Sequence, residues 1–331
     1  MMRALAIAVA VAALLWGGWW VVGARGLERG IEAAGDAARG RGWHLAYADL
    51  TVRGFPNRFD TTVTAPELAP PDGAWAWSAP FVQVLALSYR PNHVIVAAPP
   101  EQALALPGAT LRATSDDLRA SIVVAPGLDL ALDRANLAGA GLAVTDGRDA
   151  LTVAALRAAV RRAEGGGASG GAAYDVALGA EGIGVPEGLR AALSPDLPAE
   201  AGAVTLDATV TLDRPLDRRL AGPPAVVGVA LRDAALRWGD LRVAASGRLA
   251  ADPAGLAEGA LELRLADPDA AVAALGELVP PGQAAFAARF LAGLPEAEGG
   301  GVAVPLGVRG GVVSFGPVPL VALPPLSRPG S

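Results

Sequence analysis

The sequence predicts a β-dominated fold, all-β or α+β, in which long antiparallel sheets with a few short helices follow one N-terminal transmembrane helix. Two observations predict this fold. Residues 4–24 contain no charged side chain, as is typical of a membrane-spanning helix. After Trp43, apolar residues alternate with polar or small ones in many short segments, which is the period of a half-buried strand. We therefore expect a membrane anchor or signal peptide over residues 1–24 and an exported β-rich domain over residues 25–331.

The N-terminal apolar segment is long enough to cross a bilayer once. Its length of about 21 residues corresponds to a helix of about 30 Å, the thickness of the hydrocarbon layer. Trp16, Trp19 and Trp20 lie at its distal end, where aromatic rings favour the membrane interface. Arg3 precedes the segment and marks the cytoplasmic side. We expect a single-pass inner-membrane protein with the bulk of its chain in the periplasm.

A cleaved signal peptide is the alternative interpretation of this segment. Val22 and Ala24 provide the small-residue pattern that precedes a signal-peptidase cut. The tryptophans near the cut make a poor polar c-region, which favours an anchor. Under both interpretations, the remainder of the chain is exported.

Strand candidates follow one another along the exported part. A first hairpin is predicted around a turn at residues 54–57, with residues 43–47 before it and residues 59–63 after it. Turn residues also bound four further candidates, at residues 81–89, 94–98, 121–124 and 128–132. Clean alternation predicts antiparallel strands with one buried face at residues 206–212, 241–245 and 261–265.

Short helices are predicted at three places. Apolar residues at helical spacing follow the anchor, and this helix is expected to end near residues 40–42; they are Leu27, Ile31, Ala34 and Ala38. A second helix is predicted to start at Pro268, with Asp267 as its N-cap. Val272, Leu275 and Val279 would lie on one face of this helix. A third helix is expected over residues 283–291. Residues 151–162 look helical or ambiguous.

A glycine tract, GGGASGG, occupies residues 165–171. It either divides the exported domain into two halves or forms a loose hairpin loop, and we favour the loop. The tract matches the G-x-S-x-G nucleophile elbow, but His44 and His93 both precede Ser169, whereas an elbow hydrolase has its histidine after the serine. It also matches G-x-G-x-x-G, without the strand and helix that a dinucleotide site needs.

Composition excludes several kinds of chemistry. The net charge is −6, which disfavours nucleic acid because phosphate binding depends on clustered basic residues. The chain contains no cysteine and no lysine, so it has no thiolate nucleophile, no Schiff-base lysine and no Walker A lysine. A metal site built from His44 and His93 with Asp116 and Asp117 is conceivable, but local hydrogen bonding is the preferred role of both histidines. We predict no cofactor and no metal.

Seven residues are candidates for structural or interaction roles. Phe55 and Pro56 belong to the predicted hairpin turn. Phe55 lies either in the core or on a surface for a partner, and we favour the core. Pro91, Asn92 and His93 are expected to form a corner between two strands. Trp75 and Trp77 lie on one face of an extended segment, either as core residues or as an exposed aromatic patch for a partner.

Three phrases of the sequence are distinctive: GFPNRFD at residues 54–60, WSAPFVQVLALSYRPNHVIVAAP at residues 77–99 and LRWGDLRVAASGRL at residues 236–249. They resemble a known family, the bacterial envelope proteins catalogued as domain of unknown function 2125. The resemblance covers nearly everything after the anchor. It implies a single-span envelope protein with a β-rich body, distantly similar to AsmA-type lipid-handling proteins, and it implies no catalytic residues.

The function expected from these observations is non-enzymatic. A small-aliphatic sheet face must be buried, either in a core or around an apolar ligand. We expect an envelope protein whose partners are the inner membrane, through residues 4–24, and lipid along such a face. A scaffold that docks another envelope protein is the alternative, and a hydrolase is a more distant one.

Overall fold

The computed structural model describes residues 2–164, 171–194, 197–220, 222–274, 281–297 and 300–327. Strands make up about 53% of the chain and helices about 19%, and the strand pairings of the described part are antiparallel. The predicted β-dominated fold is confirmed. The chain forms two compact units: unit 1 is Met1–Val123 with Leu142–Arg148, and unit 2 is Val124–Gly141 with Asp149–Ser331.

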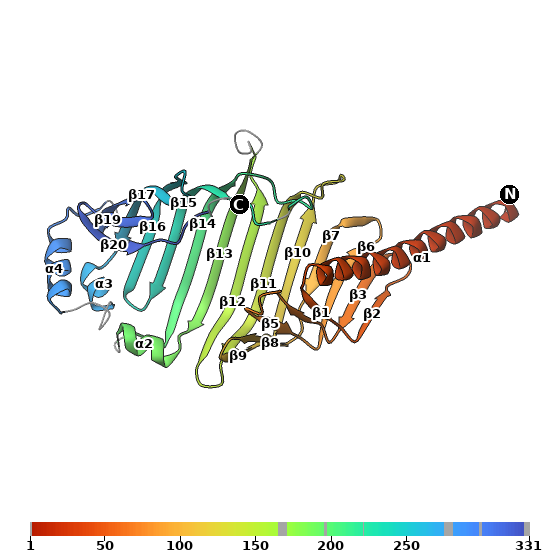
Figure 1. Cartoon of the computed structure of the whole chain (residues 1–331), viewed down its shortest axis with the longest axis horizontal. Helices are drawn as coiled ribbons and strands as arrows, with labels where there is room; N and C mark the ends of the chain where they lie inside the picture. Colours follow the sequence, from red (N-terminus) through yellow and green to blue (C-terminus); the bar gives the residue numbers. More distant parts are fainter. Residues whose placement is uncertain are drawn as a thin grey trace. The chain divides into compact units, whose positions relative to one another are not determined.

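The first element of unit 1 is one continuous helix, α1 (Met2–Gly40). Its apolar part is long enough to cross a membrane, by length and composition, and its N-terminal half projects beyond the strands of the unit (Figure 1). The sequence predicted a separate short helix after residue 24, whereas the structure continues α1 through it. The glycines of this stretch weaken a helix by only about 1 kcal/mol each, and no proline interrupts it.

The strands of unit 1 form two antiparallel ladders. The first has the order β2-β3-β6-β7-β10, and the second has the order β1-β4-β5-β8-β9 followed by the end of β11. Their bounds are β1 His44–Ala46, β2 Asp49–Arg53, β3 Arg58–Thr64, β4 Glu67–Ala69, β5 Ala76–Ser78, β6 Phe81–Leu87, β7 Arg90–Ala97, β8 Glu101–Leu106, β9 Ala109–Thr114, β10 Asp117–Val124 and β11 Leu132–Thr145.

The predicted hairpin around residues 54–57 is present but has a different first strand. β3 pairs with β2, in the register Val52 to Thr61, whereas residues 43–47 contribute β1, which pairs with β4. The prediction for residues 43–47 was therefore wrong about the partner. Alternation of side chains identifies a strand but does not identify the strand beside it.

Unit 2 is built on a ladder of seven long strands that lie side by side in chain order, β12 to β18 (Figure 1). β19 and β20 extend the ladder beyond β18. The bounds are β12 Ala150–Arg162, β13 Ala172–Gly184, β14 Glu200–Leu212, β15 Val226–Trp238, β16 Leu241–Ala251, β17 Ala257–Leu265, β18 Val302–Arg309, β19 Val312–Phe315 and β20 Val318–Ala322.

Two strand predictions in unit 2 need correction. Residues 151–162, taken as helical or ambiguous, belong to β12, and the strand expected at residues 128–132 is absent because β11 begins only at Leu132. β12 is rich in alanine, a good helix former, but pairing with β13 decides its conformation. The glycine tract joins these two paired strands; its residues 165–170, with Ser169 of the elbow motif, lie outside the described residues.

The described part of unit 2 contains three short helices: α2 (Glu187–Leu193), α3 (Pro268–Ala274) and α4 (Pro281–Ala292). α3 begins as predicted, with Asp267 Oδ1 accepting hydrogen bonds from the amides of Asp269 and Ala270 at 2.9 and 3.0 Å. The expected face of this helix cannot be followed further because Leu275 and Val279 lie outside the described residues. α4 contains the predicted helix at residues 283–291.

Candidate functional site

One face of the seven-stranded ladder in unit 2 is apolar across its whole width. In an antiparallel sheet, directly opposite residues share a face, so the register defines rows of side chains that cross all seven strands. One row is Val160, Val176, Ala208, Leu231, Gly247, Leu261 and Leu306. The next is Ala158, Leu178, Leu206, Ala234, Ala245, Leu263 and Val304. We call the surface formed by these two rows the apolar face.

The apolar face is only partly covered by other elements of unit 2. Most residues of the two rows are half-buried, whereas Ala208 and Val304 are buried. Leu291 of α4 and Val272 of α3 pack near the β17–β18 end of the face, where they contact the cluster around Leu265 and Val302. A sheet face beneath a complete second layer would be buried along its whole width. The apolar face therefore leaves aliphatic surface accessible between its covered corners.

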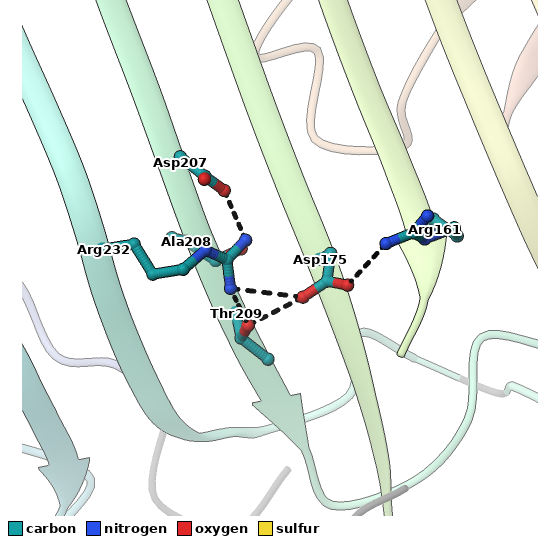
Figure 2. A network of polar contacts seen from close by, with 6 residues as sticks. All are labelled: Arg161, Asp175, Asp207, Ala208, Thr209 and Arg232. Carbon is teal, nitrogen blue, oxygen red and sulfur yellow. Dashed lines mark hydrogen bonds and ion pairs between the residues drawn. The ribbon is translucent and has the colours of Figure 1, made fainter. Parts of the chain in front are cut away.

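The opposite face of the same ladder is polar and carries a charged network (Figure 2). Arg232 lies at its centre and forms ion pairs with Asp207 and with Asp175, the second at 3.3 Å. Asp175 also pairs with Arg161 at 3.2 Å and accepts a hydrogen bond of 2.8 Å from the Thr209 hydroxyl. These charged groups have one another as partners.

The network depends on a β-bulge in β15. The register between β15 and both of its neighbours shifts around Arg232 and Asp233, and such an extra residue re-aims a side chain. Asp233 instead accepts a hydrogen bond from Thr205 at 3.5 Å.

The network lowers the pKa of two of its carboxyl groups, those of Asp175 and Asp207. The hydrogen bond from Thr209, followed by the one from Arg161, lowers the pKa of Asp175 below its ordinary value. The hydrogen bond from Arg232 lowers the pKa of Asp207, while Asp207 in turn raises the pKa of Arg232. Both carboxylates are therefore held in the charged form, which suits a structural ion pair better than a general acid.

In unit 1, the tip of the β2–β3 hairpin contacts α1 within its apolar part. The indole N–H of Trp16 donates a hydrogen bond of 3.0 Å to the carbonyl of Pro56, and that of Trp20 donates one of 2.7 Å to the carbonyl of Arg58. The Trp20 ring also stacks on Phe59, with 6.1 Å between the ring centroids. Spacing of four residues puts both indoles on one side of the helix, so α1 and the hairpin form one packed structure.

Phe55 lies at this tip and is not a core residue, contrary to the prediction. Its side chain is 61% exposed, and its ring meets Trp20 edge-on at 5.4 Å. Pro56 follows it through a cis peptide bond. The core position is taken by Phe59, which is only 8% exposed. Sequence alone does not distinguish two phenylalanines four residues apart when the turn between them is irregular.

Pro91, Asn92 and His93 lie inside β7 and not at a corner. The turn falls earlier, at Ser88 and Tyr89, and His93 pairs with Val123 of β10. His93 Nε2 is 2.9 Å from the Ser121 hydroxyl, which agrees with the local hydrogen bonding expected for this histidine.

Trp75 and Trp77 are both half-buried. The Trp77 indole donates a hydrogen bond of 3.1 Å to Gln102, and the Trp75 ring meets Trp43 edge-on at 6.0 Å. Each ring therefore packs within unit 1. The remaining exposure is compatible with a contact surface as well.

The structure does not bring the predicted metal candidates together. His44 Nε2 is 3.4 Å from Glu67, and Asp117 pairs with Arg119 at 2.7 Å. Within the described ranges, no group of three histidine, aspartate or glutamate side chains could hold a metal ion. A shallow hollow in unit 1 is lined by Glu67, Glu101 and Arg112 among other residues, and His93 is not part of its lining.

These features define a class of protein: antiparallel sheets, one of which carries two apolar rows across seven strands, together with a helix that is long and apolar enough to cross a membrane. The chain belongs to the family of uncharacterised proteins conserved in bacteria, DUF2125, whose family model matches residues 20–324. This match confirms the resemblance found in the three sequence phrases. No curated protein and no solved structure matches the chain.

Proposed function

We propose that this protein is a non-enzymatic component of the bacterial envelope, anchored in the inner membrane by α1, which binds lipid acyl chains on the apolar face of unit 2. The observation that carries the proposal is the pair of seven-residue rows without a single polar side chain. Burial of such a surface is favourable by about 25 cal/mol per Å², so an apolar ligand is the occupant that gains most from it.

The chemistry of the face favours an acyl chain over a protein partner. The backbone groups of the ladder are engaged between strands, and the rows offer no directional hydrogen-bond donor or acceptor from side chains. Protein interfaces carry several direct hydrogen bonds, which the side chains of the two rows do not provide. Seven strands at about 4.8 Å spacing span roughly 29 Å, enough for a lipid tail, which fills about half of a 30 Å hydrocarbon layer.

The contacts of α1 support a retained anchor over a cleaved signal peptide. A cut after Ala24 would remove Trp16 and Trp20, whose indole N–H groups donate hydrogen bonds to the hairpin carbonyls. It would also remove Gly23, against which the Phe59 ring packs. Export to the periplasm follows from the same orientation that places Arg3 on the cytoplasmic side.

Site-specific photo-crosslinking in bacterial membranes tests lipid binding on the full chain. A photoreactive amino acid replaces Leu206 on the apolar face or, as a matched control, its neighbour Thr205 on the polar face. Adjacent residues of a strand point to opposite faces, so the two variants differ only in the surface that they probe. We expect lipid adducts at position 206 and none at position 205.

Other outcomes of this experiment would contradict the proposal. A defined protein adduct at position 206, without lipid, would favour the scaffold alternative. Equal lipid labelling at both positions would show that the reagent reports general membrane proximity and would overturn binding by the apolar face.

A further inference from the structure

The tip of the β2–β3 hairpin lies at the same level as the last turns of the apolar segment of α1. Trp16 and Trp20 bind the hairpin carbonyls, and a Cβ on Gly17 would lie 3.6 Å from the Phe55 ring. These helix residues come well before Arg25, the first charged residue after the uncharged segment. At 1.5 Å per residue, the contacts begin about 12 Å before the end of the uncharged segment.

The length of the span puts this level in the membrane. A helix needs about 20 apolar residues to cross the hydrocarbon layer, whereas only about 12 precede Trp16 in the uncharged segment. If α1 crosses a bilayer, its last turns up to Val22 are needed for the crossing. The hairpin tip beside them must then lie in the outer part of the same bilayer.

The tip is built for such an environment. Its residues Gly54, Phe55 and Pro56 carry no charge, and Pro56 has no backbone N–H to satisfy. The indoles satisfy the carbonyl of Pro56 in the tip and that of Arg58 at the start of β3. Both carbonyls would otherwise lose water, and such unpaired groups are costly in lipid. Trp16 and Trp20 therefore act as hydrogen-bond donors to the hairpin.

A second turn lies beside the tip and adds another exposed aromatic residue. The Ser88 amide donates a hydrogen bond of 2.9 Å to the Asn57 carbonyl, which fixes the β6–β7 turn next to the hairpin. Tyr89 in this turn is 60% exposed, close to the value of Phe55. Arg53, Arg58 and Arg90 flank the two turns and are exposed, and Arg58 also pairs with Asp60 at 3.0 Å. Exposed aromatic rings with neighbouring arginines favour a phospholipid interface, where the guanidinium groups reach phosphates.

We infer that the β2–β3 tip and the β6–β7 turn form a membrane-seating surface, with Phe55 and Tyr89 inserted into the interface of the bilayer that α1 crosses. This inference rests on the anchoring role proposed for α1. It adds that unit 1 contacts the bilayer through an end of its first ladder and is not held away from it on a free linker.

Depth measurements by electron paramagnetic resonance test this surface. The chain contains no cysteine, so single cysteines can carry a nitroxide in the full-length protein, reconstituted in vesicles of phosphatidylethanolamine and phosphatidylglycerol. Phe55→Cys and Tyr89→Cys report the two turns, and Leu106→Cys reports the end of β8 before the β8–β9 turn. Val9→Cys reports α1 itself, where Val9 is 61% exposed.

We expect nitroxides at positions 55, 89 and 9 to be more accessible to oxygen than to a water-soluble nickel complex. The nitroxide at position 106 should be more accessible to the nickel complex than to oxygen. Water access at positions 55 and 89 with lipid access at position 9 would overturn the seating surface and leave the anchor standing. Water access at position 9 as well would overturn both. Lipid access at position 106 equal to that at position 55 would also contradict a contact confined to these turns.

Discussion

Arg232 shows how one residue can organise a sheet surface. It lies in the bulge of β15 and brings together two carboxylates from two other strands, Asp175 of β13 and Asp207 of β14. Its side chain is 45% exposed, so water screens the ion pairs and each of them contributes only modestly to stability. What the network contributes is a fixed polar side for the ladder, opposite the apolar face.

The network predicts an acid-dependent loss of stability. The pKa of Asp175 in the folded protein lies below the ordinary value of 3.8, so its pairing stabilises the fold above that pH and is lost as the pH falls through the folded value. Asp175→Asn should lower the free energy of unfolding at pH 7 by about 1 kcal/mol and make its fall between pH 5 and 3 shallower. Urea unfolding across this pH range measures both effects.

Asp233→Asn is the matched control for this prediction. The Asp233 carboxylate lies in the same bulge but accepts a hydrogen bond from Thr205. This variant leaves the ion pairs of Arg232 in place and should lower the free energy of unfolding at pH 7 less than Asp175→Asn does. An Asp175→Asn profile identical to that of the natural protein would contradict the role assigned to the network.

At the scale of elements, α1 and the β2–β3 hairpin fit together because glycines leave room for aromatic rings. A Cβ on Gly23 would lie 2.8 Å from Cζ of Phe59, whereas a Cβ on Gly18 would meet nothing within 4 Å. These two glycines of one helix therefore form a natural pair of test positions.

Gly23→Ala should weaken the docking of the hairpin on α1, although alanine is the better helix former. The clash with the buried Phe59 ring should cost about 1 to 3 kcal/mol, more than the gain of about 0.5 to 1 kcal/mol in helix propensity. Thermal unfolding in phospholipid nanodiscs, followed by tryptophan fluorescence, should show a lower midpoint. Gly18→Ala should leave the midpoint unchanged or raise it slightly, and equal behaviour of both variants would contradict the packing.

Elements with strong local patterns were predictable from the sequence, and those decided by tertiary pairing were not. Residues 206–212 and 261–265 alternate cleanly and form the predicted strands. β12 could not be predicted as a strand because alanine suits a helix as well as a small-residue sheet face. The hairpin partner of β3 was missed because several alternating segments compete for one ladder.

At the scale of the whole molecule, the apolar face can be recognised only from the register in which the strands pair. Alternation in single strands, such as Val176 with Leu178, indicates one apolar face per strand. It does not indicate that seven strands align these faces in unbroken rows, nor that the bulge at Arg232 restores the alignment across β15. The contact of Trp16 with Pro56 likewise joins residues 40 positions apart, which no local pattern signals.

The packing of α1 on unit 1 makes a prediction about the mature protein. Loss of residues 1–24 would expose Phe59, whose burial is worth about 1.5 to 3 kcal/mol, and would leave the carbonyls of Pro56 and Arg58 without their indole donors. We therefore expect the protein to stay in bacterial membranes when they are washed with alkaline carbonate. After solubilisation with detergent, it should still contain α1. Intact-mass spectrometry with N-terminal sequencing measures whether α1 is retained. A chain that begins at Arg25 would contradict retention. A chain that begins at the original N-terminus would support the role of α1 as a packed part of unit 1 as well as a membrane anchor.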